Sequence, residues 1–264
     1  MKPLWIIKIG GNVIDNPDAL DKFLKDFSAL DGAKVLIHGG GKIATQIAKG
    51  LGVETQMVNG RRITDAEMLK IVTMVYGGLV NKNVVAKLQA NGTNAIGMTG
   101  ADGNVIQAVK RPVKEVDFGF VGDLTETSIN DNTLAQILEA GLVPVFAALT
   151  HDGNGQMLNT NADTIASALA VGLSSRYETK LIYCFEKNGV LTDINNDDSV
   201  IAKINPHYFE ELTQQGVIAD GMLPKLQNAF TAIENGVKEV YIGNAAKLSD
   251  INQGKNFGTC LYQN

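Results

Sequence analysis

The stretch that decides the fold is residues 5–12, WIIKIGGN, where an apolar run carries one lysine and ends at two glycines. A run charged only at Lys8 predicts a strand buried on both faces, as in parallel α/β sheets. A buried lysine needs a partner, so Lys8 should lie where the strand ends and meets an anion. Gly10 and Gly11 should let the backbone turn with positive φ and bring amide groups close to that anion. The stretch predicts half of a phosphate-binding site.

Simpler explanations of the same stretch stay open. A lysine that reaches solvent at a strand end, followed by an ordinary glycine turn, would produce the same residues. The Walker loop, Gly-x-x-x-x-Gly-Lys-Ser/Thr, is absent from the chain. Any phosphate chemistry is therefore of another type.

The composition is that of a globular protein without a general affinity for polyanions. The chain has 264 residues, of which 45% are hydrophobic and 19% charged, and its formal net charge is −5. Such a chain lacks the basic face that nucleic acids and anionic membranes require. The longest apolar run, residues 142–149, is too short to span a bilayer, and no signal segment opens the sequence. We expect a cytoplasmic protein with neither nucleic-acid nor membrane partners.

Cysteine and histidine usage gives no sign of a metal site. Cys184 and Cys260 are the only cysteines and lie in apolar stretches, and His38, His151 and His207 are far apart in the sequence. These residues lack zinc-site spacing, and two cysteines do not make a disulfide framework. We expect buried free thiols and no metal held by the protein itself.

Strand and helix patterns alternate along the chain, which predicts a parallel sheet with helices on both faces. After the first strand, further strands are expected near residues 34–38, 142–146, 180–184 and 239–243. Pro144 indicates that its strand is a sheet edge or contains a bulge. The expected helices, identified by caps or apolar periodicity, lie near residues 17–30, 42–51, 65–91, 130–139, 164–171 and 206–215, with a last one opening near Pro224. Short strands with glycine turns over residues 94–124 are typical of hairpins that form lids or edges over a site.

A second glycine segment, residues 38–41 (HGGG), joins the second strand to a helix. The amides of a helix N-terminus point at whatever fills the preceding turn, so this segment predicts the second half of a phosphate site. Gly39, Gly41 and Ala44 also fit the dinucleotide fingerprint Gly-x-Gly-x-x-Ala, so a dinucleotide-binding oxidoreductase is an alternative. The acidic residue that this fingerprint expects at the end of the next strand is not in place.

Two arginines precede the long central helix in residues 59–67, NGRRITDAE. Thr64 and Glu67 predict a capping box at its start. Arginine holds a carboxylate through two parallel hydrogen bonds, so Arg62 predicts a carboxylate-binding site. Arg61 is also consistent with a solvent-exposed loop charge.

Polar residues gather where two later helices begin. Asn159, Asn161 and Asp163 precede or open an alanine-rich helix, and capping explains one of them rather than all three. Near the C-terminus, Pro224 favours the first turn of a helix, which brings Lys225 to a positive helix end. An anionic ligand would resolve that conflict.

Five motifs together resemble the amino-acid kinase family over essentially the full length, and most closely its N-acetylglutamate kinase branch. They are residues 7–11 (IKIGG), 38–41 (HGGG), 59–64 (NGRRIT), 159–163 (NTNAD) and 220–225 (DGMLPK). The resemblance implies one α/β domain over residues 1–264, an open three-layer αβα sandwich with a mainly parallel central sheet. Its N-terminal lobe, about residues 1–175, would bind an N-acyl amino acid, and its C-terminal lobe, about residues 176–264, would bind ATP.

The resemblance also implies roles for the motif residues. Lys8 and Lys225 would stabilise the transferring phosphoryl group, and Asp163 would position both lysines. Arg62 and Asn159 would hold the α-carboxylate and the neighbouring amide of the acyl substrate, to which Gly40 and Gly41 would supply backbone amides. The residues implied to face the phosphates or the rest of ATP are Gly10, Gly11, Asn161 and Glu186. Mg²⁺ would be bound mainly through the ATP phosphates.

The implied reaction is ATP-dependent phosphorylation of the γ-carboxylate of an N-acyl-L-glutamate, with N-acetyl-L-glutamate as the first choice, in arginine biosynthesis. A γ-carboxylate has an unperturbed pKa of about 4.3, so it is already a nucleophile at neutral pH. The reaction needs no general base. It needs two polyanions held in line and charge neutralised at the phosphoryl group, by lysines, glycine amides and Mg²⁺.

The chain departs from the family pattern at one turn. Where relatives have Asp-Val-x-Gly-Val-Leu near the nucleotide, residues 185–191 read FEKNGVL, and Glu186 takes the place of the aspartate. Some kinases of this branch act on N-succinylglutamate, so N-succinyl-L-glutamate is an alternative substrate. Arg61 would then meet the succinyl carboxylate.

Two further expectations concern assembly and other classes of protein. Arginine-inhibited relatives carry an N-terminal helix that builds a hexamer, whereas the first strand here is expected from about Leu4. We therefore expect a homodimer that arginine does not inhibit. A non-catalytic amino-acid sensor would keep the fold but should have lost a lysine or Asp163, and all three residues are present. An oxidoreductase would have no use for Lys8 and Lys225.

Overall fold

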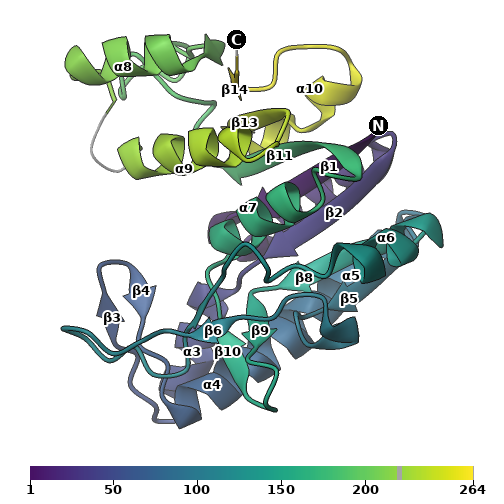
Figure 1. Cartoon of the computed structure of the whole chain (residues 1–264), viewed down its shortest axis with the longest axis vertical. Coiled ribbons are helices and arrows are strands. Elements are labelled where there is room, and N and C mark those ends of the chain that lie inside the picture. Colours follow the sequence, from purple (N-terminus) through teal and green to yellow (C-terminus); the bar gives the residue numbers. More distant parts are fainter. Residues whose placement is uncertain (219–221, 264) are drawn as a thin grey trace.

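The computed structural model describes residues 1–218 and 222–263, and one eight-stranded sheet runs through it (Figure 1). The strand order is β12-β14-β13-β11-β1-β2-β8-β5. Neighbouring strands are parallel except for the antiparallel pair β13–β14. The strands are β1 (Lys2–Ile9), β2 (Ala33–His38), β5 (Ala95–Met98), β8 (Val143–Ala147), β11 (Tyr177–Phe185), β12 (Lys203–Ile204), β13 (Glu239–Asn244) and β14 (Thr259–Tyr262). The predicted parallel sheet is confirmed.

β1 is the middle of this sheet and pairs with β2 on one side and β11 on the other. Ile6, Ile7 and Ile9 are completely buried, as expected for a strand covered on both faces. Ile9 pairs with His38, so the glycines that follow β1 and those that follow β2 lie side by side at the carboxyl ends of the strands.

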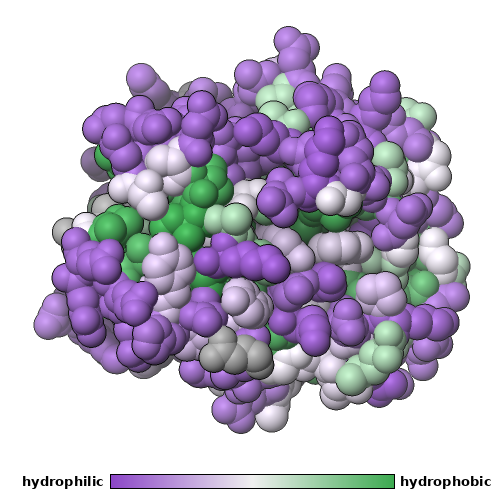
Figure 2. Space-filling model, turned by 90° about the horizontal axis from the view of Figure 1, so that it is seen from above, coloured by the Kyte–Doolittle hydropathy of each residue, from purple (hydrophilic) through white to green (hydrophobic). Residues whose placement is uncertain are grey.

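Helices cover both faces of the sheet, so the three-layer αβα architecture is confirmed (Figure 1). On one face lie α2 (Pro17–Ala29) and α5 (Asn81–Ala90), and on the other lie α6 (Asp131–Glu139), α7 (Ala162–Gly172) and α9 (Leu223–Glu234). α2 buries four apolar residues of one stripe, Leu20, Phe23, Leu24 and Phe27. Seen from above, the outer surface is mainly hydrophilic, with hydrophobic side chains showing in small areas (Figure 2).

Further helices, 3₁₀ turns and two-stranded ribbons complete the fold. The helices are α1 (Gly11–Ile14), α3 (Gly41–Gly50), α4 (Ala66–Val72), the π-helical η1 (Thr73–Val80), α8 (Pro206–Gln214), α10 (Ser249–Asn252), and the 3₁₀ turns η2 (Asp102–Asn104) and η3 (Ala245–Lys247). Antiparallel ribbons pair β3 (Met57–Val58) with β4 (Arg61–Arg62), β6 (Val109–Lys110) with β7 (Gly122–Asp123), and β9 (Leu149–His151) with β10 (Met157–Asn159). The long helix predicted over residues 65–91 is α4, η1 and α5 in succession.

β8 is an interior strand, so the edge or bulge predicted from Pro144 is wrong. The N–H of Val143 donates to the carbonyl of Asn94 at 2.9 Å, on the β5 side. Because N–H groups alternate along a strand, the nitrogen of Pro144 faces β2. Pairing with β2 begins only at Val145, opposite Leu36. The missing N–H therefore costs no ladder hydrogen bond.

The capping box predicted from Thr64 and Glu67 is also wrong. The N-cap of α4 is Asp65, whose side chain accepts a hydrogen bond from the Met68 N–H at 2.8 Å. The Thr64 hydroxyl instead accepts from Asn159 Nδ2 at 3.0 Å. Sequence spacing allowed either residue to cap the helix, and the contact with a residue 95 positions away decided between them.

His38 is fully buried at the end of β2, beneath the second glycine segment. Its Nδ1 lies 2.8 Å from the Gly39 carbonyl oxygen, and its Nε2 lies 3.0 Å from Asn81 Nδ2. An amide nitrogen only donates, so Nε2 accepts and Nδ1 carries the proton. Burial lowers the pKa of His38 to about 4, and the neutral ring ties α5 to β2.

We expect His38 to make folding stability depend on pH between about 6.5 and 4. In this window the unfolded chain binds a proton that the folded chain excludes, so the free energy of unfolding falls as pH falls. The full contribution is about 3 kcal/mol. Urea unfolding at pH 7 and 4.5 should show a weaker pH dependence for His38→Gln than for the wild type.

The matched control is His207→Gln, since His207 is on the surface with a side chain 76% exposed. This variant should keep the wild-type pH dependence. An equal pH dependence for His38→Gln and the wild type would contradict the neutral, buried state of His38.

Candidate active site

Two cavities open where the carboxyl ends of the central strands meet the glycine segments. The chain leaves β1 towards β2, whereas β11 lies on the other side of β1 and leads away towards β13. Connections that diverge in this way leave a crevice at the carboxyl ends of parallel strands, where α/β proteins bind their ligands. The fold therefore places a binding site beside Lys8, Gly10 and Gly11.

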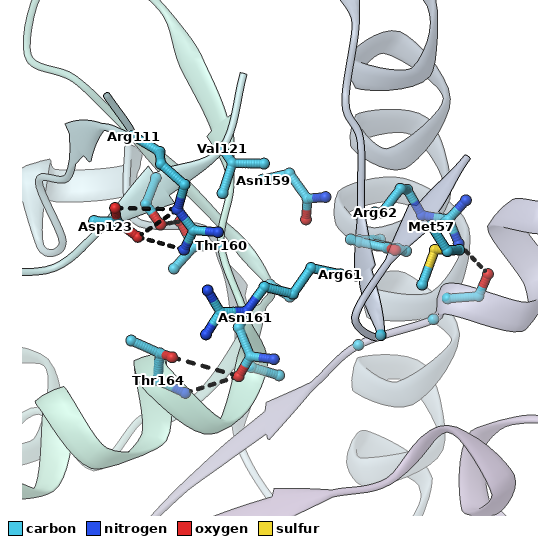
Figure 3. A pocket seen from close by; sticks show the side chains of 18 residues that line it. Met57, Arg61, Arg62, Arg111, Val121, Asp123, Asn159, Thr160, Asn161 and Thr164 are labelled. Carbon is cyan, nitrogen blue, oxygen red and sulfur yellow. Dashed lines mark hydrogen bonds and ion pairs between the residues drawn. The ribbon is translucent and has the colours of Figure 1, made fainter. Parts of the chain in front are cut away.

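The first cavity, of about 260 Å³, lies between the second glycine segment, the β3–β4 ribbon and the start of α7 (Figure 3). Among the site residues predicted from the sequence, it is lined by Gly40, Gly41, Arg62, Asn159 and Asn161. The first four are those implied to hold the acyl substrate. Asn161 was implied to face ATP, and the structure places it among the residues of the first cavity.

The second cavity, of about 450 Å³, is lined by Lys8, Gly10, Gly11, Glu186 and Lys225, together with other residues that include members of α1, α3, β11 and β13. The structure thus brings together residues from both ends of the chain. The remaining predicted residue, Asp163, is in the first turn of α7 and contacts Lys8. Of the motif at residues 220–225, Asp220 and Gly221 lie outside the described residues.

Arg62 is buried at the wall of the first cavity, and neighbouring oxygens orient its guanidinium. Its Nη2 donates to the carbonyl of Gly41 and to Thr45 Oγ1, both at 2.9 Å, and its Nη1 donates to Thr55 Oγ1 at 3.2 Å. Burial raises the pKa of Tyr76, and Arg62 opposes that shift. All the groups named here are neutral, so the positive charge of Arg62 is available to an anion in the cavity.

The other two arginines of the first cavity are arranged differently from Arg62. Arg61 is exposed, extends across the cavity towards Asn161 in Figure 3, and makes no ion pair with any residue of the described ranges. Arg111 is held by Asp123, with its Nε 3.0 Å from Oδ1 and its Nη2 2.5 Å from the same oxygen. The sequence indicated hairpins in this region, but it did not single out Arg111 or Asp123, because their shared cavity depends on how β6 pairs with β7.

Asn159 and Asn161 have separate local roles. Asn159 Nδ2 donates to Thr64 Oγ1 at 3.0 Å, which connects β10 to the arginine segment. Asn161 is the N-cap of α7, and its Oδ1 accepts from the N–H groups of Asp163 and Thr164 at 2.8 and 3.0 Å. Capping therefore explains Asn161, as expected for one of the three polar residues, and leaves Asn159 and Asp163 for other tasks.

The two glycine segments differ in backbone conformation. Gly40 has φ of 150°, and a Cβ there would lie 3.0 Å from Cδ1 of Tyr76, so the turn requires glycine. Gly10 is extended, with φ of −73° and ψ of 162°, and Gly11 begins α1. The positive φ predicted for Gly10 and Gly11 is wrong, because β1 leads directly into the turn of α1.

The side chains of Lys8 and Lys225 meet at the second cavity, and one carboxylate, that of Asp163, interacts with both charges. Lys8 Nζ lies 2.8 Å from Asp163 Oδ1. Lys225 is in the first turn of α9 beside Pro224, as predicted. Burial lowers the pKa of Lys225 and Lys8 lowers it too, whereas Asp163 raises it. This cluster carries excess positive charge and suits a strongly anionic group.

Glu186 is tied to both glycine segments at the rim of the second cavity. The Asn12 side chain donates to Glu186 Oε1, and Lys42 Nζ donates to Asn12 Oδ1. Asn12 follows the glycines after β1, and Lys42 follows the glycine segment after β2. A carboxylate therefore sits beside the cationic cluster at the position where the sequence departs from the family turn.

No metal-binding group or membrane span is found within residues 1–218 and 222–263. These residues contain no cluster of three or more His, Cys, Asp or Glu side chains that could hold a metal ion. None of their helices is long and apolar enough to cross a membrane. Both cysteines are free, and burial raises the pKa of Cys184 to about 12.

A family model described as the amino acid kinase family matches residues 3–244. The chain belongs to the amino acid kinase family. The resemblance read from the motifs is confirmed, and membership of a kinase family implies the use of ATP. The alternative of a dinucleotide-binding oxidoreductase finds no support in this match.

Curated relatives match this member of the amino acid kinase family over nearly all of its length. The acetylglutamate kinase of Cytophaga hutchinsonii is 59% identical over 266 residues, which covers 100% of both chains. The acetylglutamate kinase of Phocaeicola vulgatus is 59% identical over 247 residues, covering 94% of this chain and 95% of that protein.

Two solved structures share the fold of this chain. N-acetylglutamate synthase from Neisseria gonorrhoeae, complexed with coenzyme A and N-acetyl-glutamate, matches with a TM-score of 0.81 and 22% identity, over 100% of this chain and 60% of that one. Carbamate kinase from Giardia lamblia, bound to AMP-PNP, matches with a TM-score of 0.67 and 15% identity, over 100% of this chain and 99% of that one.

We expect Asp163→Asn to lower kcat by roughly 100-fold and to leave measurable turnover, because misplacing a positioned group costs rate without removing it. The substitution removes the carboxylate that holds Lys8 Nζ at 2.8 Å, so the two lysines are left to repel each other. The measurement is ATP-dependent turnover at saturating substrates, with circular dichroism to confirm folding.

Asp131→Asn is the matched control for Asp163→Asn. Asp131 also accepts from a cation, Arg176, at 2.6 Å, but lines neither cavity. It should retain the wild-type rate. Complete inactivity of a folded Asp163→Asn variant would show that the carboxylate takes part in bond making rather than in positioning.

Proposed function

We propose that the protein transfers the γ-phosphoryl group of ATP to the γ-carboxylate of N-acetyl-L-glutamate, the acetylglutamate kinase step of arginine biosynthesis. The names of relatives at 59% identity over 94–100% of the chain support this substrate. The observation that carries the proposal is the position of the Lys8–Asp163–Lys225 cluster beside a cavity walled by Arg62 and Asn159. The cluster suits a phosphoryl group, and the cavity suits a small carboxylate.

The first cavity would hold the acyl amino acid. Arg62 carries a positive charge that no described carboxylate neutralises, and its neighbours fix its orientation. It would bind the α-carboxylate of the substrate through parallel hydrogen bonds. The Asn159 side chain would meet the neighbouring amide group. Gly40 and Gly41, at the N-terminus of the ten-residue helix α3, would offer backbone N–H groups to the acyl substrate.

The second cavity would hold ATP. Gly10 and Gly11 would offer amides to its phosphates, and Glu186 would lie near the rest of the nucleotide. Asn161 would contribute its amide group from the side of the first cavity. In this proposal the lobe of about residues 1–175 binds the acyl amino acid and the lobe of about residues 176–264 binds most of ATP, while Lys8 and its glycines lie at the junction.

Mg²⁺ would be held through the ATP phosphates and water rather than by a cluster of protein carboxylates. Mg²⁺ keeps several waters and needs few protein ligands in phosphoryl-transfer sites. In this region Asp163 and Glu186 belong to no group of three or more metal-ligating side chains within the described residues, which is compatible with that mode of binding. When bound, the ion would neutralise part of the charge on the phosphates.

The reaction requires no proton transfer by the protein. A γ-carboxylate oxygen forms a bond to the γ-phosphorus, the bond from that phosphorus to the β,γ-bridging oxygen breaks, and ADP leaves with the electron pair. The acceptor is already ionised at neutral pH, since its unperturbed pKa is about 4.3. Lys8 and Lys225 would stabilise the charge on the transferring group. Asp163 would hold the lysines in place rather than act as a base.

The deciding experiment is ATP-dependent and Mg²⁺-dependent formation of acyl phosphate, trapped as the hydroxamate. N-acetyl-L-glutamate and N-succinyl-L-glutamate should be compared side by side. We expect N-acetyl-L-glutamate to be turned over, with no product when ATP is omitted. Turnover of neither substrate would overturn the proposal.

N-succinyl-L-glutamate is a second candidate because Arg61 reaches into the first cavity without an acidic partner in the described residues. If the succinylated substrate is used, Arg61→Ala should lower kcat/KM for it by about tenfold and affect N-acetyl-L-glutamate much less. Arg176→Ala, an exposed arginine that lines neither cavity, is the control. Equal losses on both substrates would contradict a contact between Arg61 and the succinyl carboxylate.

The assembly of the chain stays a prediction. A homodimer that arginine does not inhibit, and a cytoplasmic location, are expectations from the sequence. No partner molecule beyond the small-molecule substrates is part of the proposed function.

A further inference from the structure

One aromatic ring contacts both lysines of the second cavity. Lys225 Nζ lies 4.0 Å from the centroid of the Phe185 ring, and Lys8 Nζ lies 5.4 Å from the same centroid. Both distances are within the range in which the negative face of an aromatic ring attracts a cation. Phe185 is the last residue of β11 and lines the second cavity.

The two ammonium groups need such a neighbour because their charges are not balanced. Asp163 is the carboxylate in contact with Lys8, at 2.8 Å, so two positive charges share one negative charge. Each lysine carries its ammonium group on a flexible four-carbon side chain. The two ammonium groups would therefore move apart if nothing opposed their electrostatic repulsion. Attraction to one ring holds both heads near a common point, and the partly buried position strengthens it.

The ring itself is fixed by a second aromatic residue. Tyr183 packs against Phe185 with the ring centroids 6.2 Å apart and the planes at 25°. Tyr183 is buried, and its hydroxyl donates to the backbone carbonyl of Asp163 at 3.4 Å. Phe185 is thereby connected to the same turn of α7 that supplies the carboxylate.

We propose that Phe185 is a positioning residue for phosphoryl transfer, whose ring face holds the ammonium groups of Lys8 and Lys225 where the transferring group will lie. The inference rests on the proposed function, because it explains how two catalytic cations stay together before the anionic substrates arrive.

A different role for Phe185 would be a stacking surface for the nucleotide, since it also lines the second cavity. The two roles predict different kinetics. A stacking surface acts on binding, so its loss raises KM for ATP and leaves kcat unchanged. A ring that positions the cations acts on the transition state, so its loss lowers kcat.

The test is to replace Phe185 with phenylalanines carrying one, two and three fluorines on the ring. Fluorine withdraws charge from the ring face and changes its shape little, so a purely structural role would not respond. We expect log kcat to fall steadily with fluorine number, by about tenfold for the trifluorinated ring, with little change in KM for ATP. The same series at Phe23, which packs on Phe27 and lines neither cavity, should leave kcat unchanged.

Phe185→Leu and the pH profile provide a second readout. A ring beneath Lys225 favours its charged form, as does Asp163, whereas burial and Lys8 oppose it. Loss of the ring should move the alkaline limb of the kcat profile to lower pH. Phe185→Tyr, which keeps the ring, should keep the wild-type profile.

The outcomes separate this inference from the proposed function. If the wild type forms no acyl phosphate, the proposed function fails. If the wild type is active but kcat is the same for all fluorinated rings, or only KM for ATP changes, the positioning role of Phe185 is overturned and the proposed function stands.

Discussion

A lysine in the middle strand of a sheet imposes the constraint on which this site depends. Lys8 belongs to β1, whose neighbours on both sides are strands and whose faces are covered by helices. A charge in that position must be paired, and the ion pair between Lys8 Nζ and Asp163 Oδ1, at 2.8 Å, meets the requirement. It joins the central strand to the first turn of α7. The carboxylate that neutralises one lysine also lies close enough to act on the charge of the second.

The first cavity is organised by a comparable set of contacts between segments far apart in sequence. Thr64 accepts from Asn159, and Arg62 donates to Gly41, so the arginine ribbon is attached to both β10 and α3. Each contact uses neutral oxygens or amides and leaves the charge of Arg62 unneutralised. A pre-oriented cation of this kind binds a carboxylate without first giving up an ion pair. The cationic cluster differs, because Lys8 is paired with Asp163 there, but two lysines share this one carboxylate and positive charge is left over.

Several features of the fold and site could be predicted because their causes are local. Apolar runs, glycine turns and helix caps depend on neighbours within a few residues, which is why the parallel sheet, the helix starting beside Pro224 and the capping role of one asparagine were foreseen. The errors occurred where a distant contact decided the outcome. The Thr64 hydroxyl accepts a hydrogen bond from Asn159 and does not cap α4. Pro144 is tolerated in an interior strand because its nitrogen faces β2 one residue before the pairing with β2 begins.

By itself the sequence determined that the chain is an α/β protein and that it resembles the amino-acid kinases, and it predicted that Lys8, Lys225, Arg62 and Asp163 carry the charge-based chemistry. These conclusions follow from the order of residues along the chain. Only the tertiary structure decided that Asn161 belongs to the first cavity, that Arg111 is neutralised by Asp123 while Arg61 is not paired within the described residues, and that the Phe185 ring lies against both lysines. The physical reason is that charge and aromatic contacts depend on distances of a few ångströms between strands and helices, which the spacing of residues in a sequence does not specify.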